Sequence, residues 1–140
     1  MILPAAILEA IRAHAEEEYP RECCGLLIGR REPEAVVTAA RRARNRYGKR
    51  VRDRFEMDPH DFLQAEAEAA RAAAEILGFY HSHPDHPAWP SPSDLLQARP
   101  WPGYFHLIVA VRAEGFQKQA RVWQVTEDGE SFMEEELRAL

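Results

Sequence analysis

The chain has 140 residues, a formal net charge of −5 and a hydrophobic fraction of 46%. A domain of this length buries about 70% of the surface that its unfolded chain exposes, so a hydrophobic core can form without disulfide bonds. The net charge argues against a generally basic nucleic-acid binder, and no apolar run approaches the ~20 residues of a membrane-spanning helix. We therefore expect one domain over residues 1–140 that is not a membrane protein.

The N-terminal region predicts one helix followed by strands. Apolar residues recur at helical spacing over about residues 4–18, and Pro20 should end that helix. The apolar run 23–29 predicts a buried strand, and residues 34–40 and 51–57 predict two more. Cys23 and Cys24 are adjacent, so they form no CxxC metal pair and are expected to pack in the core on opposite faces of the strand. Free thiols favour a reducing cytoplasm.

The rest of the chain predicts two further helices and a second set of strands. Asp58 is a good N-cap for a helix whose apolar face extends to Ile76, with Gly78 just beyond its end. Residues 78–83 predict a strand, a short helix should follow Ser91, and residues 104–111 and 116–125 predict a hairpin. Residues 131–140 suit either a helix or a last strand. This order predicts a mixed sheet with helices on its faces, an α/β or α+β sandwich.

Beyond the helix that Asp58 should cap, the chain carries three residues of the types that bind a metal ion. His81 and His83 are two positions apart, so on an extended segment they point to the same face and can converge on one ion. Asp94 follows in the first turn of the short helix that Ser91 should cap. Catalytic zinc typically takes three such N/O ligands and keeps a position for water, although Mn²⁺ or Fe²⁺ accepts similar ligands.

A hydrolytic site also needs a base and a group that stabilises negative charge. A zinc-bound water has a pKa of roughly 7 and still requires a base to accept its proton. Glu22 is a candidate, because it opens a strand that is otherwise apolar. The Ser91 hydroxyl is a candidate donor to the developing oxyanion, a contribution of about 3 kcal/mol in comparable sites.

These residues resemble the JAMM (MPN+) metallopeptidase family, in its small prokaryotic form. The resemblance rests on Glu22 within PRECCGLLIGR, on HSHP at residues 81–84, and on Ser91 and Asp94 at the spacing of the family motif, and it covers nearly the whole chain. It implies a cytidine-deaminase-like α/β/α sandwich with a central mixed sheet. It also implies one Zn²⁺ on His81, His83 and Asp94, Glu22 as general acid/base, and Ser91 as oxyanion stabiliser.

The resemblance implies a substrate class as well. Members of this family cleave peptide or isopeptide bonds after the C-terminal tail of ubiquitin or ubiquitin-like proteins. The short prokaryotic forms act on ubiquitin-like sulfur carriers, after the terminal Gly-Gly, and other relatives occur in phage tail assembly. Two alternatives stay open: a non-catalytic MPN-type assembly module, and a zinc deaminase, for which His14-Ala15-Glu16 supplies H-x-E although P-C-x-x-C is absent.

Other residues have a structural and a functional interpretation. The basic stretch Arg41 to Arg54 is either a solvated loop or a surface that attracts an acidic partner. Trp89 and Trp101 either line a substrate groove or pack in an ordinary way, and Ser82 is expected to orient the loop or a histidine. Structural, loop or exposed positions are expected for His14, His60, Asp85, His86 and His106.

Overall fold

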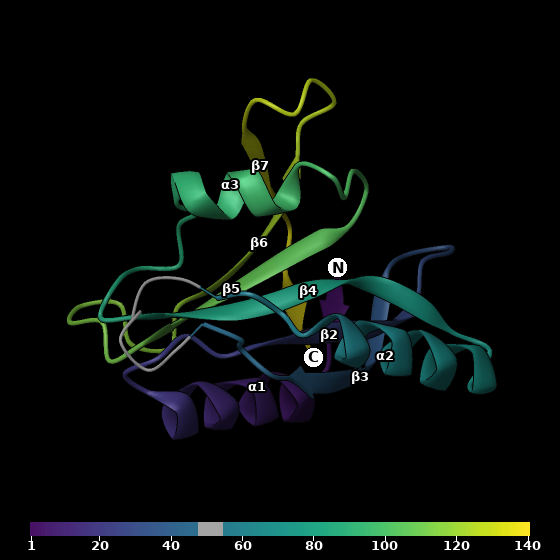
Figure 1. The fold of residues 1–140 in the computed structure, drawn as a ribbon, viewed down its shortest axis with the longest axis horizontal. Helices are drawn as coiled ribbons and strands as arrows, with labels where there is room; N and C mark the ends of the chain where they lie inside the picture. Colours follow the sequence, from purple (N-terminus) through teal and green to yellow (C-terminus); the bar gives the residue numbers. More distant parts are fainter. Residues whose placement is uncertain (48–54) are drawn as a thin grey trace.

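The structure is a computed structural model that describes residues 1–47 and 55–140. The described residues form one mixed sheet with the strand order β7-β6-β5-β4-β2-β3-β1-β8, flanked by three helices (Figure 1). The elements are β1 (Ile2–Leu3), α1 (Ala5–Glu18), β2 (Cys24–Arg30), β3 (Val36–Ala43), α2 (Pro59–Arg71), β4 (Glu75–Pro84), α3 (Pro92–Ala98), β5 (Phe105–Val111), β6 (Ala120–Val125), β7 (Phe132–Glu135) and β8 (Arg138–Ala139).

The centre of the sheet combines antiparallel and parallel pairs. Strand β2 is antiparallel to both β3 and β4, whereas β4 is parallel to β5. A parallel pair needs a crossover connection. Here that connection carries α3, which lies over the sheet on the side of β5 in Figure 1. The crossover therefore begins at the end of β4 and leads through α3 to β5.

Two apolar clusters cover the two faces of the sheet. One lies under α1 and includes Ile11, Cys23 and Tyr80. The other lies under α2 and includes Cys24 and Ala65. The two cysteines are buried and free, and they belong to different clusters, as the alternation of a strand requires. The prediction that both thiols pack in the core is confirmed.

The second helix begins as predicted and ends earlier than predicted. The Asp58 side chain accepts a hydrogen bond from the His60 backbone N–H at 2.9 Å, so Asp58 is the N-cap. The helix ends at Arg71, and Ala73 adopts a φ of +52°. Ile76, which the helical pattern included, belongs instead to β4 and is buried in the sheet. Ile76 joins the strand rather than the helix because a buried position in the sheet stabilises its side chain more than a half-exposed helix end would.

The remaining strands differ from prediction mainly at their ends. Strand β3 continues to Ala43, and β6 begins at Ala120 because residues 116–119 form a turn. The C-terminal residues form strands β7 and β8, and the short strand β1 was not predicted. Most of the strand predicted over 51–57 falls outside the described residues. Among the described helices, none is long and apolar enough to cross a membrane.

Candidate metal centre and adjoining groove

Four buried side chains converge at the end of β4. His81 and His83 lie on one face of β4, Asp94 lies in the first turn of α3, and Glu22 lies two residues before the start of β2. One ligand atom from each of the four lies within 4.8 Å of every other. The sequence predicted each of these four residues, and the structure brings them together from three separate regions of the chain.

The spacing of the nitrogen and oxygen atoms fits a metal ion. Nε2 of His81 lies 3.2 Å from Nε2 of His83 and 3.3 Å from Oδ1 of Asp94, and Nε2 of His83 lies 3.1 Å from Oδ2 of Asp94. The ligands of tetrahedral zinc lie about 2.0–2.1 Å from the ion, which places them roughly 3.3 Å from one another. The three observed distances match that spacing.

The hydrogen bond at the far side of the His83 ring supports the same interpretation. Nδ1 of His83 lies 2.9 Å from the carbonyl oxygen of Pro87, so Nδ1–H donates to that carbonyl. In a neutral imidazole the lone pair is then on Nε2, which faces the Asp94 carboxylate. Two acceptors in contact repel one another unless a cation lies between them. The donor set of this site therefore fits a bound metal ion.

Asp94 is held by the start of its own helix. Its backbone N–H donates to Oγ of Ser91 at 3.1 Å, and the Ser91 backbone N–H donates to its carboxylate at 2.9 Å, which together form a capping box. Burial would raise the pKa of Asp94. The nearby His81 ring and the hydrogen bond from the Ser91 backbone N–H outweigh burial and place that pKa well below its usual range. The carboxylate is therefore ionised and rigidly oriented.

Ser82 fastens the strand that follows Glu22 to β4. Its Oγ accepts a hydrogen bond from the Cys23 backbone N–H at 2.8 Å, and its own backbone N–H donates to the Cys23 carbonyl at 3.2 Å. The Glu22 carbonyl accepts from the Asn45 side chain at 3.0 Å. Glu22 is thus fixed by its backbone neighbours, and Ser82 orients the start of β2 rather than a histidine ring.

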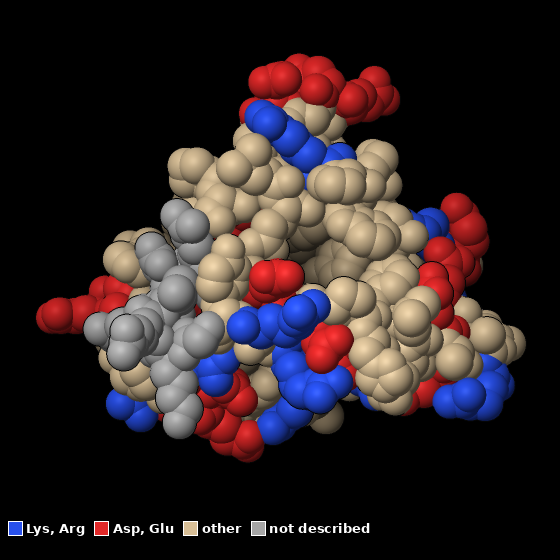
Figure 2. Space-filling view, viewed as in Figure 1, with Lys and Arg blue, Asp and Glu red and all other residues tan. Residues whose placement is uncertain are grey.

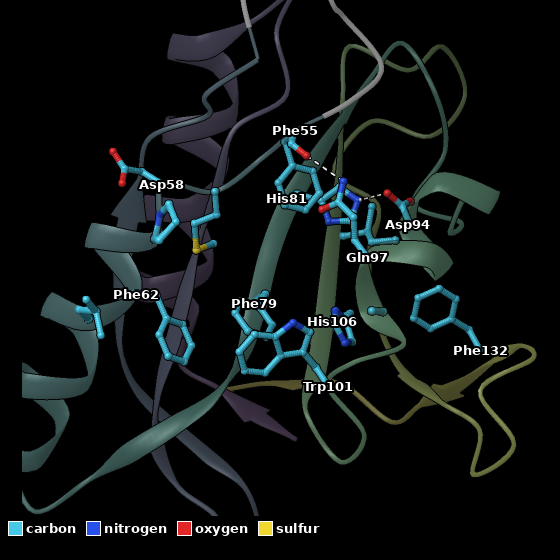
Figure 3. A pocket seen from close by; sticks show the side chains of 15 residues that line it. Phe55, Asp58, Phe62, Phe79, His81, Asp94, Gln97, Trp101, His106 and Phe132 are labelled. Atoms are coloured by element: carbon cyan, nitrogen blue, oxygen red, sulfur yellow. Dashed lines mark hydrogen bonds and ion pairs between the residues drawn. The ribbon is translucent and has the colours of Figure 1, made fainter.

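A groove adjoins the candidate metal centre. Its cavity volume is about 420 Å³, and it opens between α2 and α3 over strands β4 and β5. Figure 2 shows a hollow whose rim is formed mostly by residues that are neither acidic nor basic. In Figure 3, His81 and Asp94 lie at one end of this groove and Phe132 lies beside α3. The groove is lined by Phe55, Met57, Asp58, Pro59, Phe62, Leu63, Phe79, His81, Asp94, Gln97, Ala98, Trp101, His106, Ile108 and Phe132.

Several groove residues were not singled out in the sequence. The Phe55 ring stacks on the His81 ring, with centroids 4.6 Å apart, and the Phe55 carbonyl accepts a hydrogen bond from the Gln97 side chain at 2.7 Å. Gln97 lies one helical turn beyond Asp94, and Phe79 lies two residues before His81. Those two spacings place Gln97 and Phe79 on the faces that carry Asp94 and His81, so both could have been found from periodicity.

The two tryptophans have different positions. Trp101 lines the groove, so the groove interpretation fits it. Trp89 is not among the groove residues: it is 50% exposed, its ring packs against Trp123 at 5.1 Å, and the Arg121 guanidinium lies 4.8 Å from its ring centroid. Trp89 thus forms an aromatic and cationic cluster outside the groove.

Two other sequence features lie away from the centre. His14, of the H-x-E triplet, is a buried residue of α1 whose Nδ1 lies 2.8 Å from the Tyr80 hydroxyl, so the triplet does not join the four-residue cluster. In the described part of the basic stretch, arginines pair with acidic residues of the same chain. These pairs are Arg41 with Glu68, Arg42 with Glu17 and Arg44 with Asp58, and residues 48–54 of that stretch lie outside the described residues.

Comparison with known proteins gives the same family as the motif. Residues 4–126 match the family model of prokaryotic homologs of the JAB domain. A probable TtuB-protein conjugate cleaving protease of Thermus thermophilus is 37% identical over 99 residues, which cover 71% of this chain and 64% of the relative. A desampylase of Haloferax volcanii is 36% identical over 110 residues, covering 76% of this chain and 77% of that protein.

Solved structures share the fold. A protein of Desulfitobacterium hafniense has a TM-score of 0.87 and 30% identity, with 100% of this chain and 93% of that chain covered. A JAB1/MPN domain protein of Archaeoglobus fulgidus has a TM-score of 0.63 at 21% identity, with 100% and 99% covered. The second likeness concerns the fold alone, and it agrees with the mixed α/β architecture around a mixed sheet.

Proposed function

We propose that this chain, which belongs to the family of prokaryotic JAB domains, is a zinc metallopeptidase of the JAMM type. Its proposed reaction is hydrolysis of a peptide or isopeptide bond at the C-terminus of a ubiquitin-like, sulfur-carrier type protein. The observation that carries this proposal is the convergence of the Glu22 carboxylate with His81, His83 and Asp94 in one buried cluster. A binding module would need no acid poised beside three ligands.

The residues divide the chemistry among them. His81, His83 and Asp94 would hold one Zn²⁺ per chain, which when bound lowers the pKa of a water to roughly 7 and polarises a carbonyl. Glu22 accepts the proton of the attacking water and delivers it to the leaving amine. Ser91 donates its hydroxyl hydrogen to the developing oxyanion, which is compatible with its cap, because a hydroxyl that accepts from the Asp94 N–H still has its own hydrogen to donate.

The relatives support the substrate class. One is named for cleavage of TtuB-protein conjugates, and another is a desampylase. The groove supplies a place for an extended chain end that leads to the metal centre. We expect neither nucleic acid nor a membrane as a partner.

The same reasoning extends to fold and location. Helix α1 covers one face of the sheet, and α2 and α3 border a groove on the other, which supports a cytidine-deaminase-like α/β/α sandwich formed by one domain over residues 1–140. Two free buried thiols support a reducing compartment, the cytoplasm.

The test combines metal analysis with a cleavage assay. The substrate is a ubiquitin-like sulfur carrier extended beyond its terminal Gly-Gly by one residue, assayed in parallel with a lysine-linked conjugate of the same carrier. The wild type should hold one zinc per chain and cleave. Glu22→Gln should keep zinc and lose cleavage, and His83→Ala should lose zinc. Glu75→Gln, at the exposed opposite end of β4, is the matched control and should behave as the wild type.

Three outcomes contradict the proposal. Retained zinc in His83→Ala would refute the ligand assignment, and full activity in Glu22→Gln would refute the acid/base assignment. Protein that binds no metal when zinc is supplied would favour a non-catalytic assembly module.

A further inference from the structure

The floor of the groove consists of paired residues of β4 and β5 that lead away from the metal centre. Phe79 lies two residues before His81 on the same face of β4, and His106 lies two residues before Ile108 on β5. The register pairs His81 with Ile108 and Phe79 with His106. Residues two apart on a strand are separated by about 6.6 Å. The floor therefore has one row at the metal centre and a second row about 6.6 Å further along.

Aromatic side chains surround the second row. The Phe62 ring, from α2, lies 5.3 Å from the Trp101 ring, and both lie near Phe79, at 6.2 and 5.2 Å between ring centroids. The Phe132 ring, from β7, meets the His106 ring edge-on at 5.7 Å. Figure 3 shows these rings around one hollow beside the metal ligands. The second row is thus the base of an aromatic pocket.

Apart from two carboxylates, the lining of the pocket carries no charge. Its acidic lining residues are Asp94, which belongs to the metal cluster, and Asp58, which caps α2 and pairs with Arg44. Burial lowers the pKa of His106 to about 4, with a further lowering from His81 and an opposing effect of Asp94, so its imidazole is neutral near pH 7. At the rim, Leu63 is 62% exposed. Such a surface favours an apolar occupant.

We propose that this pocket binds a bulky apolar side chain of the substrate, located two residues before the residue whose carbonyl is attacked. The proposal rests on the proposed function and specifies its substrate. In an extended chain, side chains two apart point to the same face and are separated by the distance between the two rows of the floor. When the attacked carbonyl lies at the metal centre, the side chain two residues earlier lies over Phe79 and His106.

The pocket is assigned to the acyl side of the bond because the proposed substrate approaches the metal centre by its C-terminal tail, and the groove is continuous with that centre. His81 and Asp94 belong both to the metal cluster and to the groove lining, so a chain in the groove meets the metal centre at its end. A carrier tail that ends in Gly-Gly has no side chain on its last two residues. Its first side chain from the cut bond then falls at the aromatic pocket, where it alone decides how well the pocket is filled.

The first test measures binding, which does not depend on turnover. Zinc-loaded Glu22→Gln protein is titrated calorimetrically with tail peptides that end in X-Gly-Gly, where X is Gly, Ser, Leu or Phe. The terminal carboxylate is common to the series, so differences in affinity report how well residue X fits the pocket. Leu and Phe should bind on the order of ten-fold more tightly than Gly, and Ser should bind like Gly. Equal affinities across the series would overturn the proposal.

The second test compares pocket variants. Trp101→Ala should reduce the preference for Leu and Phe over Gly several-fold, whereas Phe116→Ala, which removes a 43%-exposed aromatic ring outside the groove, should leave it unchanged. Thermal unfolding establishes that each variant is folded. Leu63→Ala, at an exposed position of the rim, gives the same comparison if Trp101→Ala does not fold. An unchanged preference in a folded pocket variant would count against the pocket as the binding site.

Cleavage by the wild type separates this proposal from the proposed function. The same X series is extended by one residue after Gly-Gly, and a second series carries the bulky residue after the cut bond. Zinc-dependent cleavage with no dependence on X, or with dependence on the second series alone, would refute the pocket assignment and leave the function intact. Preferential binding without cleavage would refute the function and support the pocket.

Discussion

His106 should make this protein less stable in mild acid. Burial and the His81 charge lower the pKa of His106 to about 4 in the folded protein, against 6.5 in an unfolded chain, despite an opposing effect of Asp94. The unfolded state therefore binds a proton first as the pH falls. The free energy of unfolding should decrease through the window from about pH 6.5 to about pH 4, and this group should add no further loss below it. The expected loss from His106 is about 2 kcal/mol at pH 5 and about 3 kcal/mol at pH 4.

The assay is urea unfolding of the chelated protein at pH 7.5 and pH 5.0, with wild type and His106→Phe in parallel. The variant keeps an aromatic ring between Phe79 and Phe132 and removes the titrating group, whose Nε2 is buried without a hydrogen-bond partner among the described residues. The wild type should lose about 2 kcal/mol more than the variant between the two pH values. An equal loss in both proteins would refute the reasoning, because the pH dependence would then arise from other groups.

Three further predictions concern other parts of the molecule. Gly25→Ala should lower the free energy of unfolding by about 2–4 kcal/mol in urea, because its Cβ would overlap the Tyr80 ring; a loss below 1 kcal/mol would contradict this. Ser91→Ala should cost about 1 kcal/mol of stability and lower kcat by a factor of about 10²–10³, whereas Ser91→Thr should restore the cap; unchanged kcat would exclude the oxyanion role. Iodoacetamide should modify Cys23 slowly at pH 8 until urea unfolds the protein, because burial raises the pKa of this thiol to about 12; rapid labelling of folded protein would contradict that burial.

Three residues of the candidate metal centre could be predicted because their positions depend on local geometry. The i, i+2 spacing of His81 and His83 needs only an extended backbone, and Ser91 with Pro92 is a local helix start that fixes Asp94. Glu22 is different, since no local rule joins it to residues about 60 positions later. It was found from the family motif and from the oddity of an acid at the edge of a buried strand.

The groove and the element ends depended on long-range packing. Phe132 lines the groove because β7 pairs with β6, and no local pattern near residue 132 specifies that pairing. The end of α2 was predicted too late because Ala72, Ala73 and Ile76 continue a helical spacing. Burial of Ile76 in the sheet decides against that pattern. In α2 the capped start was therefore predicted better than the end, whereas α1, which has no side-chain cap, begins and ends close to the expected residues 4–18.

The position of Asp94 in the crossover has a consequence for how the groove assembles. An ion shared by His81, His83 and Asp94 would tie β4 to the seven-residue helix that begins the return to β5. The same helix contributes Gln97 and Ala98 to the groove wall. Occupancy of the centre and order of the wall are then linked by mass action, so scarcity of metal would weaken substrate capture together with turnover. Amide hydrogen exchange in residues 92–98 should slow when zinc is added. An exchange rate that does not change with zinc would show that this part of the groove wall is ordered without the metal.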